Sequence, residues 1–179
     1  MEDIPYKVIR SARRTMAIQI LPDGQVLLRC PYGITDGQIR QFADSKADWI
    51  RKHLPDSAQR PAAFSAQQLR ELTTQASQVI PQRVAVLAPL VGVTYGRVTI
   101  RHQHTRWGSC STKGNLNFNC LLMLAPPQVL DYVVVHELCH RKEMNHSPRF
   151  WAEVERVFPE YKACRKWLRE NGQILIARL

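Results

Sequence analysis

The chain of 179 residues is 45% hydrophobic and 22% charged, which suffices for the core of one globular domain spanning residues 1–179. It lacks the roughly 18-residue apolar run of a membrane helix, a secretory-signal pattern and CxxC spacing among its five cysteines. We therefore expect a cytoplasmic protein without a membrane span, a disulfide framework or a four-cysteine zinc site. The formal charge of +10 is compatible with nucleic-acid association through a basic surface, but the excess is diffuse and more typical of a solvated surface, and residues 126–179 carry only 9 basic against 7 acidic side chains.

The first half of the chain shows strand patterns followed by helical patterns. The turn residues of LPDG, at 21–24, predict a hairpin between the second and third strands. Thr35 is placed to cap the first helix and Pro55 to stop it, while Pro81 is expected to interrupt the second because proline lacks a backbone donor. Strands are expected at 6–11, 15–20 and 25–30, and helices at 35–54 and 66–90, with a connector at 55–66.

The second half repeats strands before helices. Strands are predicted at 97–103 and 116–124, separated by the polar segment TRWGSCSTKGN. Pro126 and Pro127 suit the start of an apolar helix over 128–144, and Ser147 followed by Pro148 suits the start of a last helix reaching Phe158. The order of elements predicts an α+β fold with N-terminal strands and helices, a small sheet, and a helix with ionisable residues followed by a C-terminal helix.

The chemistry is concentrated in the sequence HELCHRKEMNH, which contains three of the six histidines. In a helix His136 and His140 lie one turn apart on one face and can bind the same metal ion, whereas Glu137 is displaced by about 100°. A catalytic zinc usually has three protein ligands and an open position, so a third ligand is needed. His146 lies beyond the expected helix end, where a chain reversal brings it back toward the ion. A lone histidine on an apolar helix is more often a structural one, but this combination predicts Zn²⁺ bound by His136, His140 and His146.

The ligand set predicts a reaction class. Three neutral imidazoles leave zinc its full charge, which lowers the pKa of a bound water toward about 7. Glu137 is then expected to act as general base in the hydrolysis of an amide and to pass the proton to the leaving amine. Several side chains are able to assist at the oxyanion, and the sequence does not distinguish between them: Arg106, His102, His104, Tyr132 and Tyr161.

Three segments together resemble a known family. IRSARRTMAIQILPDGQVLLRCP, TRWGSCSTKGNLNFN and YVVVHELCHRKEMNHSPRFW are similar to the YgjP-like (DUF45) predicted metal-dependent hydrolases, relatives of the WLM and SprT-type zincin peptidases. The resemblance runs over nearly the whole chain and implies a zincin-like metallopeptidase domain acting on protein or peptide substrates. It also implies that Arg106, Trp107 and Gly108, which match the family's second motif, line the substrate cleft, where glycine admits a close backbone approach. The alternative is that Trp107 packs in the core and Arg106 pairs with an acid.

Other assignments remain open from the sequence. Glu143, Glu153 or Glu155 is a possible third ligand in place of His146, and Cys110 occupies the place of the cysteine ligand of peptide deformylases. A metal-dependent endoribonuclease family shares the histidine spacing but has glycine where Glu137 stands, which favours the peptidase. A zincin module associated with nucleic acid, with little activity of its own, is the further alternative.

Overall fold

The computed structural model describes residues 4–21, 24–54 and 62–179, and the chain divides near residue 62 into two compact units. Unit 1 extends to Ala62 and unit 2 runs from Ala63 to Ala177. The expectation of one domain over 1–179 did not foresee this division, because overall composition says nothing about where contacts become sparse. Most of the expected connector at 55–66, and Pro22 and Asp23 of the expected turn, lie outside the described residues.

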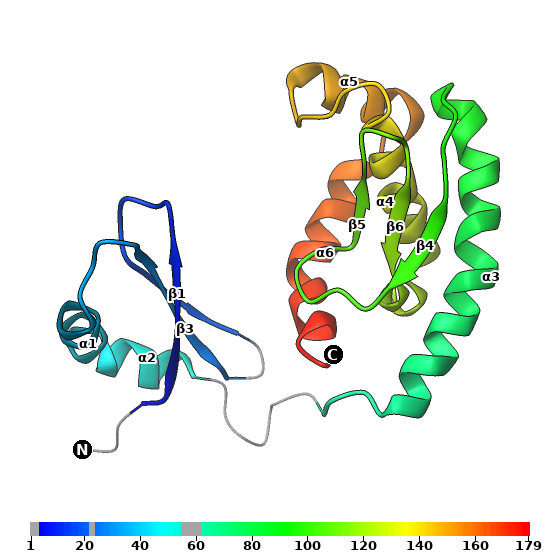
Figure 1. Cartoon of the computed structure of the whole chain (residues 1–179). Coiled ribbons are helices and arrows are strands. Elements are labelled where there is room, and N and C mark those ends of the chain that lie inside the picture. The colour runs from blue at the N-terminus through cyan, green and yellow to red at the C-terminus, as the bar shows by residue number, and fades with distance from the viewer. Residues whose placement is uncertain (1–3, 22–23, 55–61) are drawn as a thin grey trace. The chain divides into compact units, whose positions relative to one another are not determined.

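Unit 1 is a small sheet with two helices (Figure 1). Strand β3 pairs in parallel with β1 and antiparallel with β2, which confirms the pairing of the second and third strands. Its core includes Leu28, Cys30, Ile39 and Ala43. The elements are β1 (Tyr6–Ser11), β2 (Ala17–Ile20), β3 (Val26–Pro31), α1 (Asp36–Ser45) and α2 (Ala47–His53).

The helix predicted over 35–54 begins where expected, but the structure divides it into the two helices α1 and α2. The side chain of Thr35 accepts from the backbone of Gln38, and the Gln38 side chain accepts from the Thr35 backbone, which forms a capping box. The helix breaks at Lys46, whose backbone N–H bonds to the carbonyl of Ala43 in a tight turn. Side-chain spacing alone does not reveal such a break.

Unit 2 combines a second three-stranded sheet with the long helix α3 and three later α-helices (Figure 1). The sheet has the order β4-β6-β5, in which β6 is parallel to β4 and antiparallel to β5. Helix α4 contacts α3, β5, α5 and α6, so it occupies the centre of the unit. The elements are α3 (Ala66–Val91), β4 (Val98–Arg101), β5 (Gly108–Cys110), β6 (Leu116–Asn119), the 3₁₀ helix η2 (Cys120–Leu124), α4 (Pro127–Cys139), α5 (Pro148–Val157) and α6 (Tyr161–Ile176).

Two predictions in unit 2 need correction. Helix α3 continues through Pro81, because a buried stripe including Ala76, Ile80 and Val84 packs against the core on both sides of the proline. The strand expected over 116–124 ends at Asn119, whose side chain accepts from the backbone N–H of Leu121 and starts η2. Tertiary packing keeps α3 continuous, and a local hydrogen bond ends the strand.

Other features of the fold agree with expectation. The α+β class is confirmed, and α5 begins at Pro148 with Ser147 as its N-cap. Helix α6 follows α5, although the sequence pattern predicted no further helix there. The cysteines are all free. No helix within the described residues has the length and apolarity to cross a membrane.

Candidate metal centre

Helix α4 presents His136 and Glu137 in its last turn. Pro127 starts the helix, and the buried side chains of Tyr132 and of residues 133–135 fix it in the core of unit 2. His140 follows immediately after the last helical residue, with its ring centroid 5.0 Å from that of His136. The one-turn spacing therefore brings the two imidazoles together as predicted.

The helix ends at Cys139, five residues before the predicted end at Met144. The backbone N–H of Arg141 bonds to the carbonyl of Leu138, which tightens the chain into a 3₁₀-type turn. The Arg141 guanidinium also donates to the carbonyl oxygens of Thr94 and Thr112, so the turn is tied to neighbouring loops. Because the helix stops early, the segment can return and place His146 beside His136.

Three histidine rings converge at this point. Ligand nitrogens of His136, His140 and His146 all lie within 4.8 Å of one another, and the Nε2 atoms of His136 and His146 are 3.0 Å apart. The other ring nitrogens are occupied: Nδ1 of His140 lies 3.0 Å from the carbonyl oxygen of Glu143, and Nδ1 of His136 lies 3.4 Å from the Tyr132 hydroxyl. Donation from Nδ1 leaves the Nε2 lone pair free for an ion.

The donor set fits zinc. Zinc holds imidazole nitrogens at about 2.0–2.1 Å, so neighbouring ligand atoms in a tetrahedral site lie roughly 3.3 Å apart. The observed spacing needs only small movements of the rings to meet that geometry. Within the described residues, these three histidines form the group able to hold a metal ion.

Burial favours the neutral forms of His136, His140 and Glu137 in the metal-free protein. Desolvation, reinforced by the charges of His140, His146 and Arg165, lowers the pKa of His136 to about 3. Burial also lowers the pKa of His140, against the hydrogen bond to the Glu143 carbonyl. Burial raises the pKa of Glu137 to about 8, while the charge of Arg106 opposes the shift.

Glu137 packs against the sheet edge at Gly108. A Cβ atom on Gly108 would lie 2.6 Å from Oε1 of Glu137 and 2.7 Å from its Cγ, so only glycine fits without displacing the carboxyl group. Gly108 begins β5, an edge strand of its sheet. The contact therefore joins the candidate catalytic acid to the edge strand.

The other two residues of the second motif have different surroundings. Arg106 is exposed and forms no salt bridge among the described residues, but its charge acts on the carboxyl group of Glu137. Trp107 is partly buried, with its ring packed against Gly172 of α6. The fully buried Asn119 holds the segment by donating from Nδ2 to the carbonyls of Gln103 and Arg106. Sequence reasoning missed Asn119, because an asparagine ending a strand carries no distinctive pattern.

Competing ligands are engaged elsewhere. Glu153 pairs with Lys142 and Arg156, and Glu155 pairs with Lys162. Cys110 and Glu143 do not join the histidine group in the described chain.

Two of the candidate oxyanion residues also have other contacts. Nε2 of His102 lies 2.7 Å from the Thr73 hydroxyl. The Tyr132 hydroxyl faces His136 instead of an open cleft. Because both side chains already have these partners, their geometry does not favour a role at the oxyanion.

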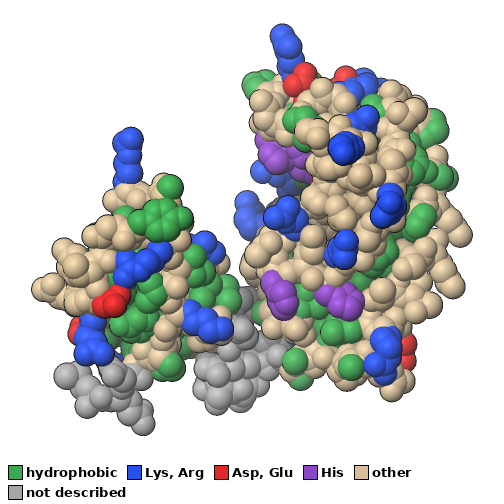
Figure 2. All heavy atoms as spheres, in the orientation of Figure 1, with side chains coloured by type: hydrophobic (Ala, Val, Ile, Leu, Met, Phe, Trp, Pro, Cys, Tyr) green, Lys and Arg blue, Asp and Glu red, His purple; other side chains and the backbone are tan. Residues whose placement is uncertain are grey.

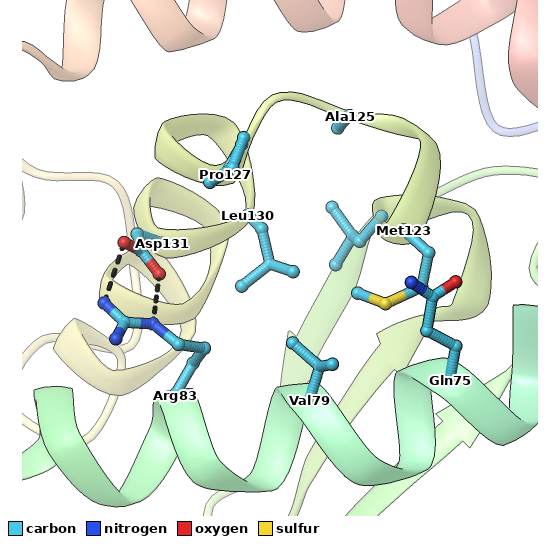
Figure 3. Close-up of a pocket in the computed structure, with 9 residues that line it drawn as sticks. Gln75, Val79, Arg83, Met123, Ala125, Pro127, Leu130 and Asp131 are labelled. Carbon is cyan, nitrogen blue, oxygen red and sulfur yellow. Dashed lines mark hydrogen bonds and ion pairs between the residues drawn. The ribbon is translucent and has the colours of Figure 1, made fainter.

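A separate cavity of about 460 Å³ lies between α3, η2 and the first turns of α4 (Figure 3). Leu130, Val79 and Met123 give it an apolar interior, and a bidentate ion pair between Arg83 and Asp131 closes one side. None of the histidine ligands or Glu137 lines this cavity. It is therefore distinct from the metal centre.

One family model matches most of the chain, and two solved structures resemble about half of it. The family model described as "YgjP-like, metallopeptidase domain" matches residues 14–74 and 55–171. The crystal structure of the metallopeptidase zymogen abylysin of Pyrococcus abyssi is 25% identical, over 51% of this chain and 94% of that chain, with a TM-score of 0.47. That of jannalysin of Methanocaldococcus jannaschii, also a metallopeptidase zymogen, is 20% identical over 52% and 96%, with a TM-score of 0.46. No curated protein matches, and no comparison supports the ribonuclease or nucleic-acid alternatives.

Proposed function

The chain belongs to the YgjP-like metallopeptidase family, and on this basis we propose that it is a zinc-dependent peptidase of protein or peptide substrates. His136, His140 and His146 would hold the ion, and Glu137 would act as general base and then general acid. The observation that carries the proposal is the convergence of the three histidines directly beside Glu137 on α4. Three imidazole nitrogens form a donor set that suits Zn²⁺.

Each residue has a defined task in this scheme. When bound, zinc supplies Lewis acidity that polarises the scissile carbonyl and makes water more acidic. Tyr132 and the Glu143 carbonyl orient the rings of His136 and His140 through Nδ1. Glu137 accepts a proton from the attacking water and donates it to the amine nitrogen that leaves. Burial raises the pKa of Glu137 to about 8 in the metal-free protein, which supports a role in which this side chain holds the proton before the second step.

The edge strand supplies a place for the substrate. An extended peptide can add to the free edge of β5, in the manner of β-augmentation, beside the Glu137 carboxyl group. In this arrangement Gly108 permits the close approach and Arg106 faces the substrate. Trp107 holds the segment by packing on α6.

Metal analysis of the wild type, two variants and one control variant tests the assignment. The wild type should contain one equivalent of zinc, and His146→Ala should lose it. Glu137→Gln should retain zinc but hydrolyse peptides about 10² to 10⁴ times more slowly. His53→Ala, which removes an exposed histidine outside the group, serves as the control and should match the wild type.

Two results would contradict the proposal. Full zinc occupancy in His146→Ala would assign the third ligand to another residue. RNA cleavage that survives in Glu137→Gln would favour the ribonuclease.

A further inference from the structure

Two arginines with exposed guanidinium groups lie near the metal centre. Arg165 on α6 and Arg106 before β5 form no salt bridge among the described residues, although the charge of Arg106 acts on the carboxyl group of Glu137. By contrast, Arg83 pairs with Asp131, and Arg141 donates to two backbone carbonyls. The guanidinium groups of Arg83 and Arg141 stabilise the fold. Those of Arg165 and Arg106 leave hydrogen-bond donors available.

Arg165 is held in place by an aromatic ring. Its guanidinium carbon lies 4.3 Å from the centroid of the Trp151 ring. The same ring lies 5.7 Å from His146 and stacks on Tyr161 at 5.4 Å. Stacking on an aromatic face fixes the guanidinium plane and keeps its charge, while the N–H groups at its edge remain free to bind a carboxylate in two-point fashion.

The distance between the Arg165 guanidinium and the metal centre is one that a nearby residue of a bound peptide can span. The Trp151 ring centroid lies 5.8 Å from that of His136, so the guanidinium carbon is within roughly 10 Å of His136. An extended peptide advances about 3.3 Å per residue, so this reach corresponds to about three positions. Arg106 lies two residues before Gly108, which contacts Glu137.

Basic side chains outnumber acidic ones on one face of unit 2. Figure 2 shows Lys and Arg side chains on the same face as histidine side chains, with a few acidic side chains at its upper end. An acidic peptide would find both long-range attraction and specific donors here.

We propose that Arg165, stacked on Trp151, and Arg106 form a carboxylate-binding subsite, so that preferred substrates are peptides with Asp or Glu within about three positions of the scissile bond. The proposal rests on the peptidase function proposed above. It adds a substrate class that neither the family nor the histidine cluster specifies.

Binding and hydrolysis are measured separately, so that the two proposals can fail independently. Fluorescent peptides containing Glu at one position are compared with matched Gln peptides, by anisotropy with zinc-loaded Glu137→Gln protein. We expect the Glu peptides to bind about 10 to 100 times more tightly, since charge-assisted hydrogen bonds are involved. Adding Arg165→Gln should remove most of this preference, and adding Arg165→Glu should reverse it in favour of Lys peptides.

The control is Arg70→Gln, which removes an exposed arginine from α3 and should retain the preference. Equal binding of Glu and Gln peptides would overturn the subsite, as would a preference that persists when Arg165→Gln and Arg106→Gln are combined. Tighter binding of a single-stranded oligonucleotide than of the Glu peptides would assign the arginines to nucleic acid instead. Absence of peptide hydrolysis by the wild type would refute the peptidase, without affecting the binding comparison.

Discussion

Glu137 should make the stability of the metal-free protein depend on pH in an unusual direction. Its side chain is buried on α4, and burial raises its pKa from 4.5 to about 8 in the folded protein. The folded state therefore binds more protons than the unfolded state between these values. Stability is fully present below about pH 4.5 and declines as the pH rises toward 8.

The size of this effect follows from the shift. With one pKa unit equal to about 1.36 kcal/mol, the loss is about 1 kcal/mol at pH 5, about 3 kcal/mol at pH 7 and about 5 kcal/mol at pH 9. Glu137→Gln keeps the shape of the side chain but cannot ionise. After removal of zinc, this variant should therefore gain about 4 kcal/mol over the wild type between pH 5 and pH 9.

His136 acts in the opposite direction and at lower pH. Burial lowers its pKa from 6.5 to about 3, so its contribution to stability is present above pH 6.5 and is lost as the pH falls. From pH 7 to pH 5 this loss is about 2 kcal/mol. The lowered pKa of His140 acts in the same direction, so both histidines oppose the effect of Glu137 in the wild type. Glu137→Gln should therefore show a steeper loss of stability than the wild type as the pH falls from 7 to 5.

Urea denaturation of EDTA-treated proteins at pH 5, 7 and 9 measures these quantities. The difference between wild type and Glu137→Gln isolates Glu137, because His136 is common to both. Glu71→Gln removes an exposed carboxyl group and should give a difference that is constant with pH. A constant difference for Glu137→Gln as well would refute the argument that burial sets the protonation of Glu137.

Other substitutions test the packing around the site. Gly108→Ala should displace the Glu137 carboxyl group. Denaturation should show a loss of about 1–3 kcal/mol in the stability of the protein. Peptide assays should show kcat/KM reduced at least about tenfold, and metal analysis should show that zinc is retained. Asn119→Ala removes buried hydrogen bonds and should cost about 3 kcal/mol in urea denaturation; a loss below about 0.5 kcal/mol would contradict that role. A double-mutant cycle on Arg83→Ala and Asp131→Ala should give a coupling energy of about 0.5–1 kcal/mol, and zero coupling would show that solvent screens the pair.

The sequence predicted that the three histidines come together, because the signal is local. The spacing of His136 and His140 matches one helical turn, and the Pro–Pro pair before Gln128 marks the start of that helix. The chain reversal toward His146 was expected from the distance alone. The helix end was placed too late, because the carbonyls that bind the Arg141 guanidinium come from loops around Thr94 and Thr112.

Features that depend on tertiary contact were not predictable in this way. Arg165 belongs to the densest basic cluster of the sequence, KACRKWLR, which was visible as charge but not as a site. Its position beside the histidines requires Trp151, which lies on a different helix. Likewise, the division into two units reflects sparse contacts near residue 62 and not a change in composition.

Because Gly108 contacts Glu137, we expect mutations in β5 and mutations in the turn after Cys139 to have different effects. Because the carboxyl group packs directly on β5, a shift of this strand displaces the general base and the substrate edge together. The histidine nitrogens are instead positioned by the Tyr132 hydroxyl and by the turn after Cys139. Substitutions in β5 should therefore lower turnover while zinc affinity stays unchanged, and substitutions in the turn should weaken zinc binding first. A substitution in β5 that released zinc before it reduced turnover would show that the strand also supports the ligands.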